Sequence, residues 1–505
     1  MRLTLAEAAR IAGGTIAGGS PLSEAPPGTE AHGGRADVGQ TQTSGVSVDS
    51  RRLRPGEIFV ALRGEYVDGH DYVPEAFRSG ASAAVVSRRV EPSGGPWGPL
   101  VVVEDPLAAL RSLATWVRDI ADPLVVGITG STGKTSTKDL LASVASVKFR
   151  TVAAERSHNN ELGVPLTLLK TASDTQVLIC ELGARGPGQI RELCSYVRPQ
   201  VGVVTNVGVT HYEQFGSRDA IVSAKSELPA SLPEGGAAVL NADDPRVAGM
   251  ARITPADVVT FGTGSGAWLR AEAIELDRRG RPSFRLVRGY ERVAVELPLP
   301  GRHQVSNALA AAAAGLVLGL SLEEARGGLE AARSSPWRME VTERGGVVVV
   351  NDAYNANPTS MAAALETCAA MVPEGGRLLA VLGYMAELGD LEVPEHEAMG
   401  ELAARRVRRL VVVGERAAPL AAAAERAGLS DVRRVPGGSD PEAVLAALGE
   451  PSPGDVVLVK ASRVAALERL AERLASAVEE PVEEPAEGRR GHPAQDPVEH
   501  PVEAR

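Results

Sequence analysis

Short runs of apolar residues alternate along the chain with longer segments rich in alanine and leucine. Continuous apolar runs are typical of strands buried in a parallel sheet, and the longer segments have the length of connecting helices. We therefore predict an α/β fold with mostly parallel sheets and helices on both faces. The predicted buried strands are residues 124–129, 177–181, 201–206, 237–241, 347–351, 378–382, 410–413 and 456–460. Because ligands of open α/β sheets bind beyond the carboxyl ends of strands, residues that follow these runs are the first site candidates.

Two proline-containing breaks, at residues 119–123 and 333–336, divide the alternating pattern. At 505 residues the chain is too long for one ordinary domain, so we take the breaks as domain boundaries. The predicted domains are a smaller N-terminal α/β domain over 1–120, a central domain over 121–333 and a C-terminal domain over 334–478.

Two segments lack any apolar period. Residues 479–505 are rich in proline and acidic side chains, so we expect a disordered acidic tail. Residues 18–44 are rich in glycine, proline, serine and threonine, which predicts a long surface loop. Neither segment carries evident chemistry.

The composition narrows the class of protein. Apolar residues make up 44% of the chain and charged residues 23%, which excludes disorder throughout. The net charge of -11 argues against nonspecific binding to nucleic acid or anionic lipid. Three cysteines without paired spacing predict neither a disulfide framework nor a zinc site. The N-terminus has no signal-peptide pattern and no apolar run approaches a membrane span, so we expect a cytoplasmic protein without membrane insertion.

A glycine-rich loop follows the predicted strand 124–129 and leads into a predicted helix. Backbone N–H groups of such a loop converge on phosphate oxygens, and the helix start adds partial positive charge. Lys134 can neutralise the β- and γ-phosphates, and Thr135 is placed to bind Mg²⁺. The strict pattern requires glycine where Ile128 stands, so this is a variant spacing. The sequence predicts nucleoside triphosphate binding by Thr129, Gly130, Ser131, Thr132, Gly133, Lys134 and Thr135.

Three further residues could choose between the classes of nucleotide-binding protein. Glu181 ends a predicted strand, His211 lies beyond another, and Lys225 lies on a predicted helix. A strand-end carboxylate can hold a nucleotide-bound Mg²⁺. Taken singly, however, each residue has an ordinary alternative: a solvated glutamate, a loop histidine or a solvated lysine. Their order along the chain is what carries information.

Read in that order, the variant loop, Glu181, the Asn-Val-Gly-Val-Thr-His run at 206–211 and the Ala-Lys-Ser-Glu segment at 224–227 resemble the Mur ligase family. The likeness extends over nearly everything between residues 45 and 478. Further segments that carry it are 49–51, 55–64, 68–70, 159–167, 351–358, 382–389 and 459–463.

The resemblance implies a three-domain, ATP-dependent enzyme that forms a peptide bond through an acyl phosphate. The N-terminal domain would hold a UDP moiety, the central P-loop-type domain would hold ATP, and a Rossmann-like C-terminal domain would close over the site. The chain is most similar to family members that join D-alanyl-D-alanine to UDP-N-acetylmuramoyl-tripeptide, a step of peptidoglycan synthesis. A monomer is expected. The nature of the third peptide residue, diaminopimelate or lysine, stays open.

The resemblance also implies roles for residues of the catalytic centre. Thr135 and Glu181 would hold one Mg²⁺ on the phosphates, and His211 would help to hold a second. Lys225 matches a lysine that the family carbamylates with CO₂, which would give an anionic group that bridges the metals. Lys134 would act on the transferred phosphoryl group.

Nucleotide and substrate contacts follow from the same resemblance. Asn307 would contact adenine with His303 nearby, Arg338 would reach the phosphate, and Asp352 the ribose. The expected substrate contacts are Ser50 and Arg51 toward the UDP-sugar, Asn159 and Asn160 toward the muramoyl-peptide, and Asn355 and Asn357 in the C-terminal domain. Serine and asparagine are also common turn residues, so a purely local role is the alternative for each of them.

Rival functions stay open at this point. Tyr384 stands where the pattern of the D-alanyl-D-alanine-adding members has aspartate, and Val209-Thr210 replaces a commoner Pro-Ala. A sister ligase that adds the third residue would show Asp-Asn-Pro-Arg, which is missing. A folylpolyglutamate synthetase is a second rival. A nucleotide switch that hydrolyses ATP without ligation would need no UDP-sugar domain.

Overall fold

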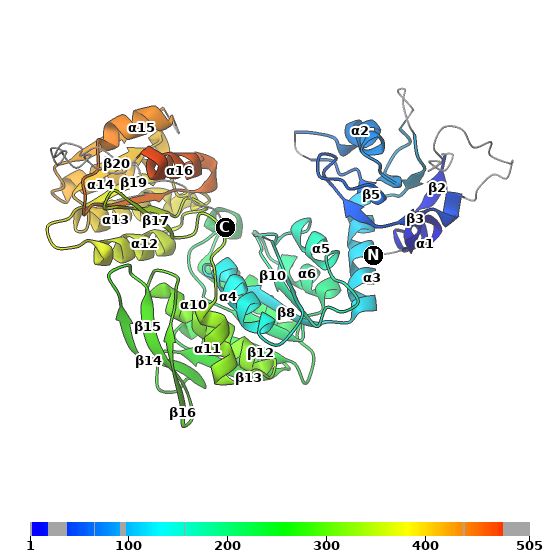
Figure 1. Cartoon of the computed structure of the whole chain (residues 1–505), viewed down its shortest axis with the longest axis horizontal. Helices are drawn as coiled ribbons and strands as arrows, with labels where there is room; N and C mark the ends of the chain where they lie inside the picture. Colours follow the sequence, from blue (N-terminus) through cyan, green and yellow to red (C-terminus); the bar gives the residue numbers. More distant parts are fainter. Residues whose placement is uncertain are drawn as a thin grey trace, which may run out of the picture.

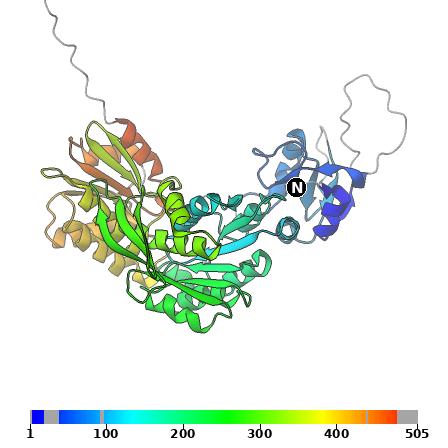
Figure 2. The same cartoon turned by 60° about the horizontal axis from the view of Figure 1, so that its bottom comes forward.

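The computed structural model describes residues 3–18, 38–64, 66–90, 97–155, 157–437 and 440–477. The described chain forms three α/β domains, and the N-terminal and C-terminal domains lie at opposite ends of the molecule with the central domain between them (Figures 1 and 2). The predicted α/β class with mainly parallel sheets is confirmed. The predicted tail 479–505 lies outside the described residues, as do residues 19–37 of the predicted loop.

The N-terminal domain is built on a five-stranded sheet of order β2-β7-β6-β5-β4, with β1 and β3 paired apart from it. Residues 42–43, which we assigned to a loop, form β3 because Thr43 is buried and its hydroxyl donates to Leu3 O at 3.0 Å. The strands are β1 (Leu3–Thr4), β2 (Thr15–Ala17), β3 (Gln42–Thr43), β4 (Gly45–Ser47), β5 (Glu57–Val60), β6 (Ala83–Val86) and β7 (Leu100–Val102). The helices are α1 (Leu5–Ile11), α2 (Val73–Arg78) and α3 (Pro106–Ala121).

The central domain contains a nine-stranded sheet of order β16-β15-β14-β13-β12-β11-β8-β10-β9. It is parallel from β9 to β14 and antiparallel from β14 to β16. The strands are β8 (Leu124–Thr129), β9 (Thr151–Ala153), β10 (Val177–Glu181), β11 (Val201–Val204), β12 (Ala237–Asn241), β13 (Asp257–Gly262), β14 (Leu269–Leu276), β15 (Pro282–Arg288) and β16 (Glu291–Glu296). The helices are α4 (Lys134–Ser146), α5 (Gly163–Leu168), α6 (Gln189–Val197), α7 (Tyr212–Phe215), α8 (Arg218–Ala230), α9 (Pro245–Ala248), α10 (His303–Val317) and α11 (Leu322–Glu330).

Predicted strands 124–129, 177–181 and 237–241 are confirmed, whereas the strand predicted at 201–206 ends at Val204. Strands β13 to β16 were not predicted, because exposed positions interrupt their apolar runs.

Close packing sets the position of α4. A Cβ on Gly315 of α10 would lie 2.6 Å from Val144 Cγ1, and one on Gly328 of α11 would lie 2.4 Å from Val144 Cα. The two glycines therefore let both helices approach α4 closely.

The C-terminal domain has a six-stranded sheet of order β17-β18-β22-β19-β20-β21, parallel except at β17. The strands are β17 (Glu340–Arg344), β18 (Val347–Asn351), β19 (Leu378–Gly383), β20 (Arg409–Val413), β21 (Val432–Val435) and β22 (Val456–Lys460). The helices are α12 (Pro358–Met371), α13 (Glu392–Ala404), α14 (Ala418–Arg426), α15 (Pro441–Leu448) and α16 (Glu468–Ala477). The four strands predicted here are confirmed to within a residue at each end.

The predicted domain boundaries near residues 120 and 333 stay predictions, although the sheets fall on either side of them. Over the described ranges, the structure contains no helix with both the length and the apolar character needed to cross a bilayer.

Candidate active site

The glycine-rich loop joins β8 to α4, and two of its glycines have positive φ. Gly130 has φ 143° and Gly133 has φ 79°. A Cβ on Gly130 would lie 2.0 Å from Thr205 Oγ1, and one on Gly133 would lie 2.3 Å from Asn307 Oδ1. Both positions therefore need glycine for two reasons, the backbone conformation and the close approach of a neighbouring side chain.

The segment after β11 holds the loop from one side. Ser131 N donates to Asn206 O at 2.9 Å, and Thr132 N donates to Asn206 Oδ1 at 3.0 Å. Thr205 Oγ1 donates to Thr132 O at 2.6 Å, and Ser131 Oγ donates to Gly208 O at 2.9 Å. These contacts explain why β11 stops at Val204, since the residues after it turn to support the loop. The loop is thus held in shape by the protein itself.

Lys134 is the first residue of α4, and its ammonium is folded over the loop. Nζ donates to Gly130 O at 2.7 Å and to Ser131 O at 3.3 Å. Burial lowers the pKa of Lys134, and the carboxylate of Glu181 partly opposes this shift. A cation on a phosphate-binding loop is suited to binding phosphate oxygens.

Thr135 and Glu181 meet at the carboxyl ends of the central strands. Thr135 Oγ1 donates to Glu181 Oε2 at 2.8 Å, and Asn159 Nδ2 donates to Glu181 Oε1 at 2.8 Å. In the described ranges, no group of three or more His, Cys, Asp or Glu side chains could hold a metal alone. A nucleotide-bound Mg²⁺ is held by one or two protein ligands together with phosphate oxygens. A hydroxyl and a buried carboxylate fit that donor set.

Lys225 is buried on α8, with 1% of its surface exposed. The solvated lysine that is the ordinary alternative for this residue is therefore wrong. Burial and the neighbouring Lys134 ammonium lower the pKa of Lys225 to about 7, while Glu227 and Glu181 partly oppose this. At neutral pH a large share of such an amine is unprotonated, as nucleophilic attack on CO₂ requires.

Among the described residues, His211 forms no hydrogen bond or ion pair with Thr135 or Glu181. It has φ 54°, and its Nδ1 lies 2.5 Å from Glu387 Oε2 of the C-terminal domain. The adjacent imidazole of His211 lowers the pKa of Glu387. The backbone of Glu213 also donates to Glu387 O at 3.2 Å. His211 therefore contributes to the contact between two domains, and its role at a second Mg²⁺ stays a prediction.

Asn307 and His303 lie in the first half of α10. Asn307 Oδ1 lies against Gly133, and its Nδ2 donates to Gln304 Oε1 at 2.8 Å. His303 is the first residue of the helix, where burial lowers its pKa and Asp352 partly opposes the shift. Within the described part of the chain, His303 Nδ1 is buried without a hydrogen-bond partner. The structure thus places both predicted nucleotide residues between the phosphate loop and the C-terminal domain.

Arg338 reaches the phosphate site from the start of the C-terminal domain. Its Nη2 donates to Thr135 Oγ1 at 2.9 Å and to Ser157 Oγ at 3.0 Å. The guanidinium lies over the ring of Tyr354, 4.2 Å from the centroid. Arg338 is therefore brought to the same hydroxyl that contacts Glu181, and stacking on the ring fixes its direction.

Asp352 has a partner that sequence reasoning did not single out. Its Oδ2 lies 2.5 Å from Nζ of Lys460, a buried lysine at the end of β22, and its Oδ1 accepts from Met339 N at 3.1 Å. The sequence did offer a signal for this pair, because Lys460 ends an apolar strand. A lysine at such a position is buried, and a buried charge needs a counter-ion. Ser157 was also missed, because a lone serine in a loop carries no distinctive pattern.

The predicted substrate residues of the N-terminal domain lie apart from the phosphate loop. Ser50 is buried, and its hydroxyl donates to Glu75 Oε2 at 3.2 Å. Arg51 is exposed and donates to both carboxylate oxygens of Asp49 at 2.9 Å. The N-terminal domain therefore presents an accessible guanidinium at this position.

Three of the predicted asparagines make local contacts. Asn160 Oδ1 accepts from Gly163 N at 2.9 Å, and Asn355 Oδ1 accepts from Ala356 N at 2.9 Å. Asn357 is the N-cap of α12, and its Oδ1 accepts from Ser360 N at 2.9 Å. Asn159 differs from them because it contacts Glu181 in the phosphate site. Substrate contacts of these asparagines stay predictions.

Known proteins resemble this chain over nearly its whole length. Three family descriptions match it: "Mur ligase family, catalytic domain" over residues 42–115, "Mur ligase middle domain" over 128–315 and "Mur ligase, glutamate ligase domain" over 337–463. The UDP-N-acetylmuramoyl-tripeptide--D-alanyl-D-alanine ligase of Mycobacterium tuberculosis is 42% identical, over 93% of this chain and 97% of that protein. The chain belongs to the Mur ligase family.

Solved structures of Mur ligases show the same architecture. MurF from Acinetobacter baumannii superposes with a TM-score of 0.79 at 30% identity, over 94% of this chain and 99% of that one. MurF ligase from Thermotoga maritima, solved in complex with ADP, gives a TM-score of 0.75 at 29% identity, over 86% of this chain and 98% of that one. The predicted family and three-domain fold are confirmed, and the protein is a ligase.

Proposed function

We propose that this Mur ligase joins D-alanyl-D-alanine to UDP-N-acetylmuramoyl-tripeptide at the expense of ATP. The products would be the pentapeptide precursor of peptidoglycan, ADP and phosphate. The observation that carries the proposal is the 42% identity, across nearly the full length of both chains, with a relative named for this reaction. Matches in all three domains support it, because the reaction has to bring three substrates together. Its place of action would be the cytoplasm, and it would act as a monomer.

ATP would bind where the phosphate loop meets the C-terminal domain. The neighbour from Thermotoga maritima, whose structure contains ADP, supports nucleotide binding by this fold. The triphosphate would lie on residues 129–135, with Lys134 and Arg338 as its cations. Asn307 and His303 would contact the adenine. Asp352 would contact the ribose while keeping Lys460 as its counter-ion.

Mg²⁺ fits the oxygen donors that the site offers. Thr135 and Glu181 would hold one ion, since their oxygen atoms already lie side by side. His211 and carbamylated Lys225 would hold a second ion, for which His211 would have to exchange its contact with Glu387. When bound, Mg²⁺ would supply positive charge that stabilises the phosphate oxygens.

The chemical need for ATP follows from the carboxylate substrate. A carboxylate resists attack by an amine because it is already anionic and its oxygen leaves poorly. The tripeptide carboxylate accepts the γ-phosphoryl group and becomes an acyl phosphate, and ADP leaves. The amine of D-alanyl-D-alanine then attacks the carbonyl carbon, loses a proton, and expels phosphate from the tetrahedral intermediate. Lys134 and Arg338 act in the first step by reducing the repulsion between the two anions that must meet.

Carbamylation of Lys225 would convert a buried cation into a buried anion. The neutral amine attacks CO₂, a C–N bond forms, and one proton is released to give the carbamate. The lowered pKa of about 7 and the burial of Lys225 support this proposal. The carbamate would lie near Glu181 and Lys134, both of which influence the Lys225 amine.

The peptide substrates would be positioned by residues outside the phosphate loop. Ser50 and Arg51 would hold the UDP moiety, and Asn159 and Asn160 the muramoyl-peptide. Asn355 and Asn357 would contact substrate from the C-terminal domain through groups that their turn contacts leave available. For Arg51 this requires competition with Asp49, which an anionic diphosphate can achieve.

A ligation assay tests the proposal. Phosphate release should require both UDP-N-acetylmuramoyl-tripeptide and D-alanyl-D-alanine, and ¹⁸O in the tripeptide carboxylate should pass into the released phosphate. A sister ligase would reject the dipeptide, and a nucleotide switch would ignore both substrates. The Lys134→Ala change should lower turnover at least about 100-fold. The exposed Lys148 supplies the control Lys148→Ala, which should keep its activity. Absence of label in the phosphate would refute the acyl-phosphate route.

A further inference from the structure

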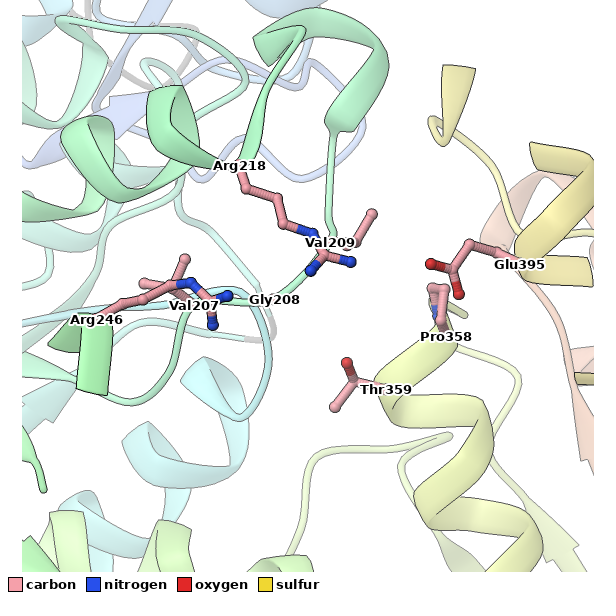
Figure 3. Close-up of a pocket in the computed structure, with 8 residues that line it drawn as sticks. All are labelled: Val207, Gly208, Val209, Arg218, Arg246, Pro358, Thr359 and Glu395. Atoms are coloured by element: carbon pink, nitrogen blue, oxygen red, sulfur yellow. The ribbon is translucent and has the colours of Figure 1, made fainter. Parts of the chain in front are cut away.

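A cavity of about 250 Å³ lies between the central and C-terminal domains. Its central-domain wall contains Gly208 and the side chains of Arg218 and Arg246, and its C-terminal wall contains Thr359 and Glu395 (Figure 3). None of the residues that line this cavity has a role in the nucleotide site proposed above.

The two arginines are free to bind a ligand. Arg218 is the first residue of α8 and Arg246 lies on α9, and both guanidinium groups reach toward Gly208 (Figure 3). No carboxylate in the described ranges forms an ion pair with either of them. Guanidinium groups are planar, permanently charged donors that match a carboxylate in bidentate fashion. Two of them converging on one space favour an anionic ligand there.

The cavity adjoins the phosphate loop directly. Gly208 lines it, and the carbonyl of the same residue accepts the hydrogen bond from Ser131 Oγ at 2.9 Å. A ligand in the cavity would therefore lie beside the loop that we propose to hold the triphosphate. That position suits a group of a peptide substrate more than a separate regulatory ligand.

The opposite wall distinguishes a peptide carboxylate from a phosphate. Thr359 lies in the first turn of α12 and places a hydroxyl on this wall. Glu395 of α13 faces the arginines across the space and forms no ion pair with a described residue (Figure 3). A doubly charged phosphate would be repelled by this glutamate. A peptide with both a carboxylate and an ammonium group meets complementary charges on the two walls.

We propose that Arg218 and Arg246 bind a carboxylate of a peptide substrate and so contribute to the specificity of the ligation. The proposal rests on the ligase function given above. The carboxylate has two possible sources: the C-terminus of D-alanyl-D-alanine, or the side chain of diaminopimelate as third residue of the nucleotide substrate. The chemistry of recognition is the same for both.

Steady-state kinetics of Arg218→Gln, Arg246→Gln and the double variant test the proposal. Each variant is assayed with D-alanyl-D-alanine and with its C-terminal amide, and with nucleotide substrates that carry diaminopimelate or lysine. Loss of one bidentate contact should raise KM for the carboxylate-bearing substrate about tenfold or more, with kcat and the KM for ATP little changed. Arg252→Gln is the matched control, because Arg252 is exposed in the same domain and does not line the cavity.

The pattern of losses decides between the outcomes. A loss with the dipeptide but not with its amide supports the dipeptide carboxylate. A loss with the diaminopimelate substrate but not with the lysine substrate supports the side-chain carboxylate. Equal effects on substrates with and without the carboxylate, or kinetics like those of Arg252→Gln, would overturn the proposal while wild-type ligation still upheld the proposed function. Arg218→Lys and Arg246→Lys should recover part of the loss, because they keep the charge without the bidentate geometry.

Discussion

Replacing Lys225 by methionine should stabilise the central domain at low pH and abolish ligation. Methionine is unbranched and of similar length, so it can fill the buried space on α8 without the charge. The pKa of Lys225 falls from its ordinary value of 10.5 to about 7, which means that the folded protein disfavours the ammonium. At about 1.4 kcal/mol for each pH unit, the folded state bears a penalty of about 5 kcal/mol when this lysine is charged.

The sign of the pH dependence follows from proton binding. Below pH 7 the lysine is charged in both the folded and the unfolded state, so the penalty is fully present. Between pH 7 and pH 10.5 the unfolded state binds one more proton, so the stability of the wild-type protein rises with pH. The advantage of Lys225→Met should therefore fall from about 5 kcal/mol at pH 6 to about 2 kcal/mol at pH 9.

The stability difference between Lys225→Met and the wild type is measured by unfolding in urea. Hydrogen–deuterium exchange of peptides from β8 and β11 monitors the unfolding of the central domain. A single midpoint would mix the three domains. The buffer should be free of CO₂, because a carbamate would replace the titrating ammonium. Lys148→Met is the control, since an exposed ammonium has no desolvation penalty to lose. A stability difference between variant and wild type that stays constant from pH 6 to pH 9 would refute the reasoning.

Two further changes test the loop and the C-terminal domain. Gly133→Ala should abolish ADP binding in calorimetry and should destabilise the protein more than Gly216→Ala does. Both glycines have positive φ, but only a Cβ at residue 133 meets another atom, Asn307 Oδ1. Equal losses of stability in the two variants would contradict the steric argument. Asp352→Ala should destabilise the C-terminal domain by about 3–5 kcal/mol, because it leaves the buried ammonium of Lys460 without its counter-ion. Adding Lys460→Met should restore much of that loss in urea unfolding, and a double variant no more stable than Asp352→Ala would argue against the pair.

Strands and the phosphate loop were predictable because their signals are local. A buried parallel strand is an uninterrupted apolar run, so β8, β10, β12, β18 and β22 could be delimited directly from the sequence. The glycine-rich loop likewise combines a strand, a turn and a helix start within a few residues. By contrast, β14 to β16 alternate exposed and buried positions in a way that a search for continuous runs does not detect.

The partners of charged residues could not be predicted, because they depend on contacts between distant parts of the chain. The resemblance places His211 at a second Mg²⁺, yet in the structure it pairs with Glu387 of another domain. The resemblance placed Asp352 at the ribose, and the fold adds Lys460 from a strand far along the chain. A residue's position in a motif does not specify which side chains will surround it.

By itself, then, the sequence determined the α/β class, the nucleotide loop and the family, because apolar periodicity and ordered motifs are properties of the chain. Only the tertiary structure decided that Lys225 is buried, that Arg338 reaches Thr135, and that Arg218 and Arg246 converge beside Gly208. Burial and electrostatic environment arise when strands and helices pack, and packing brings together residues that no local pattern relates.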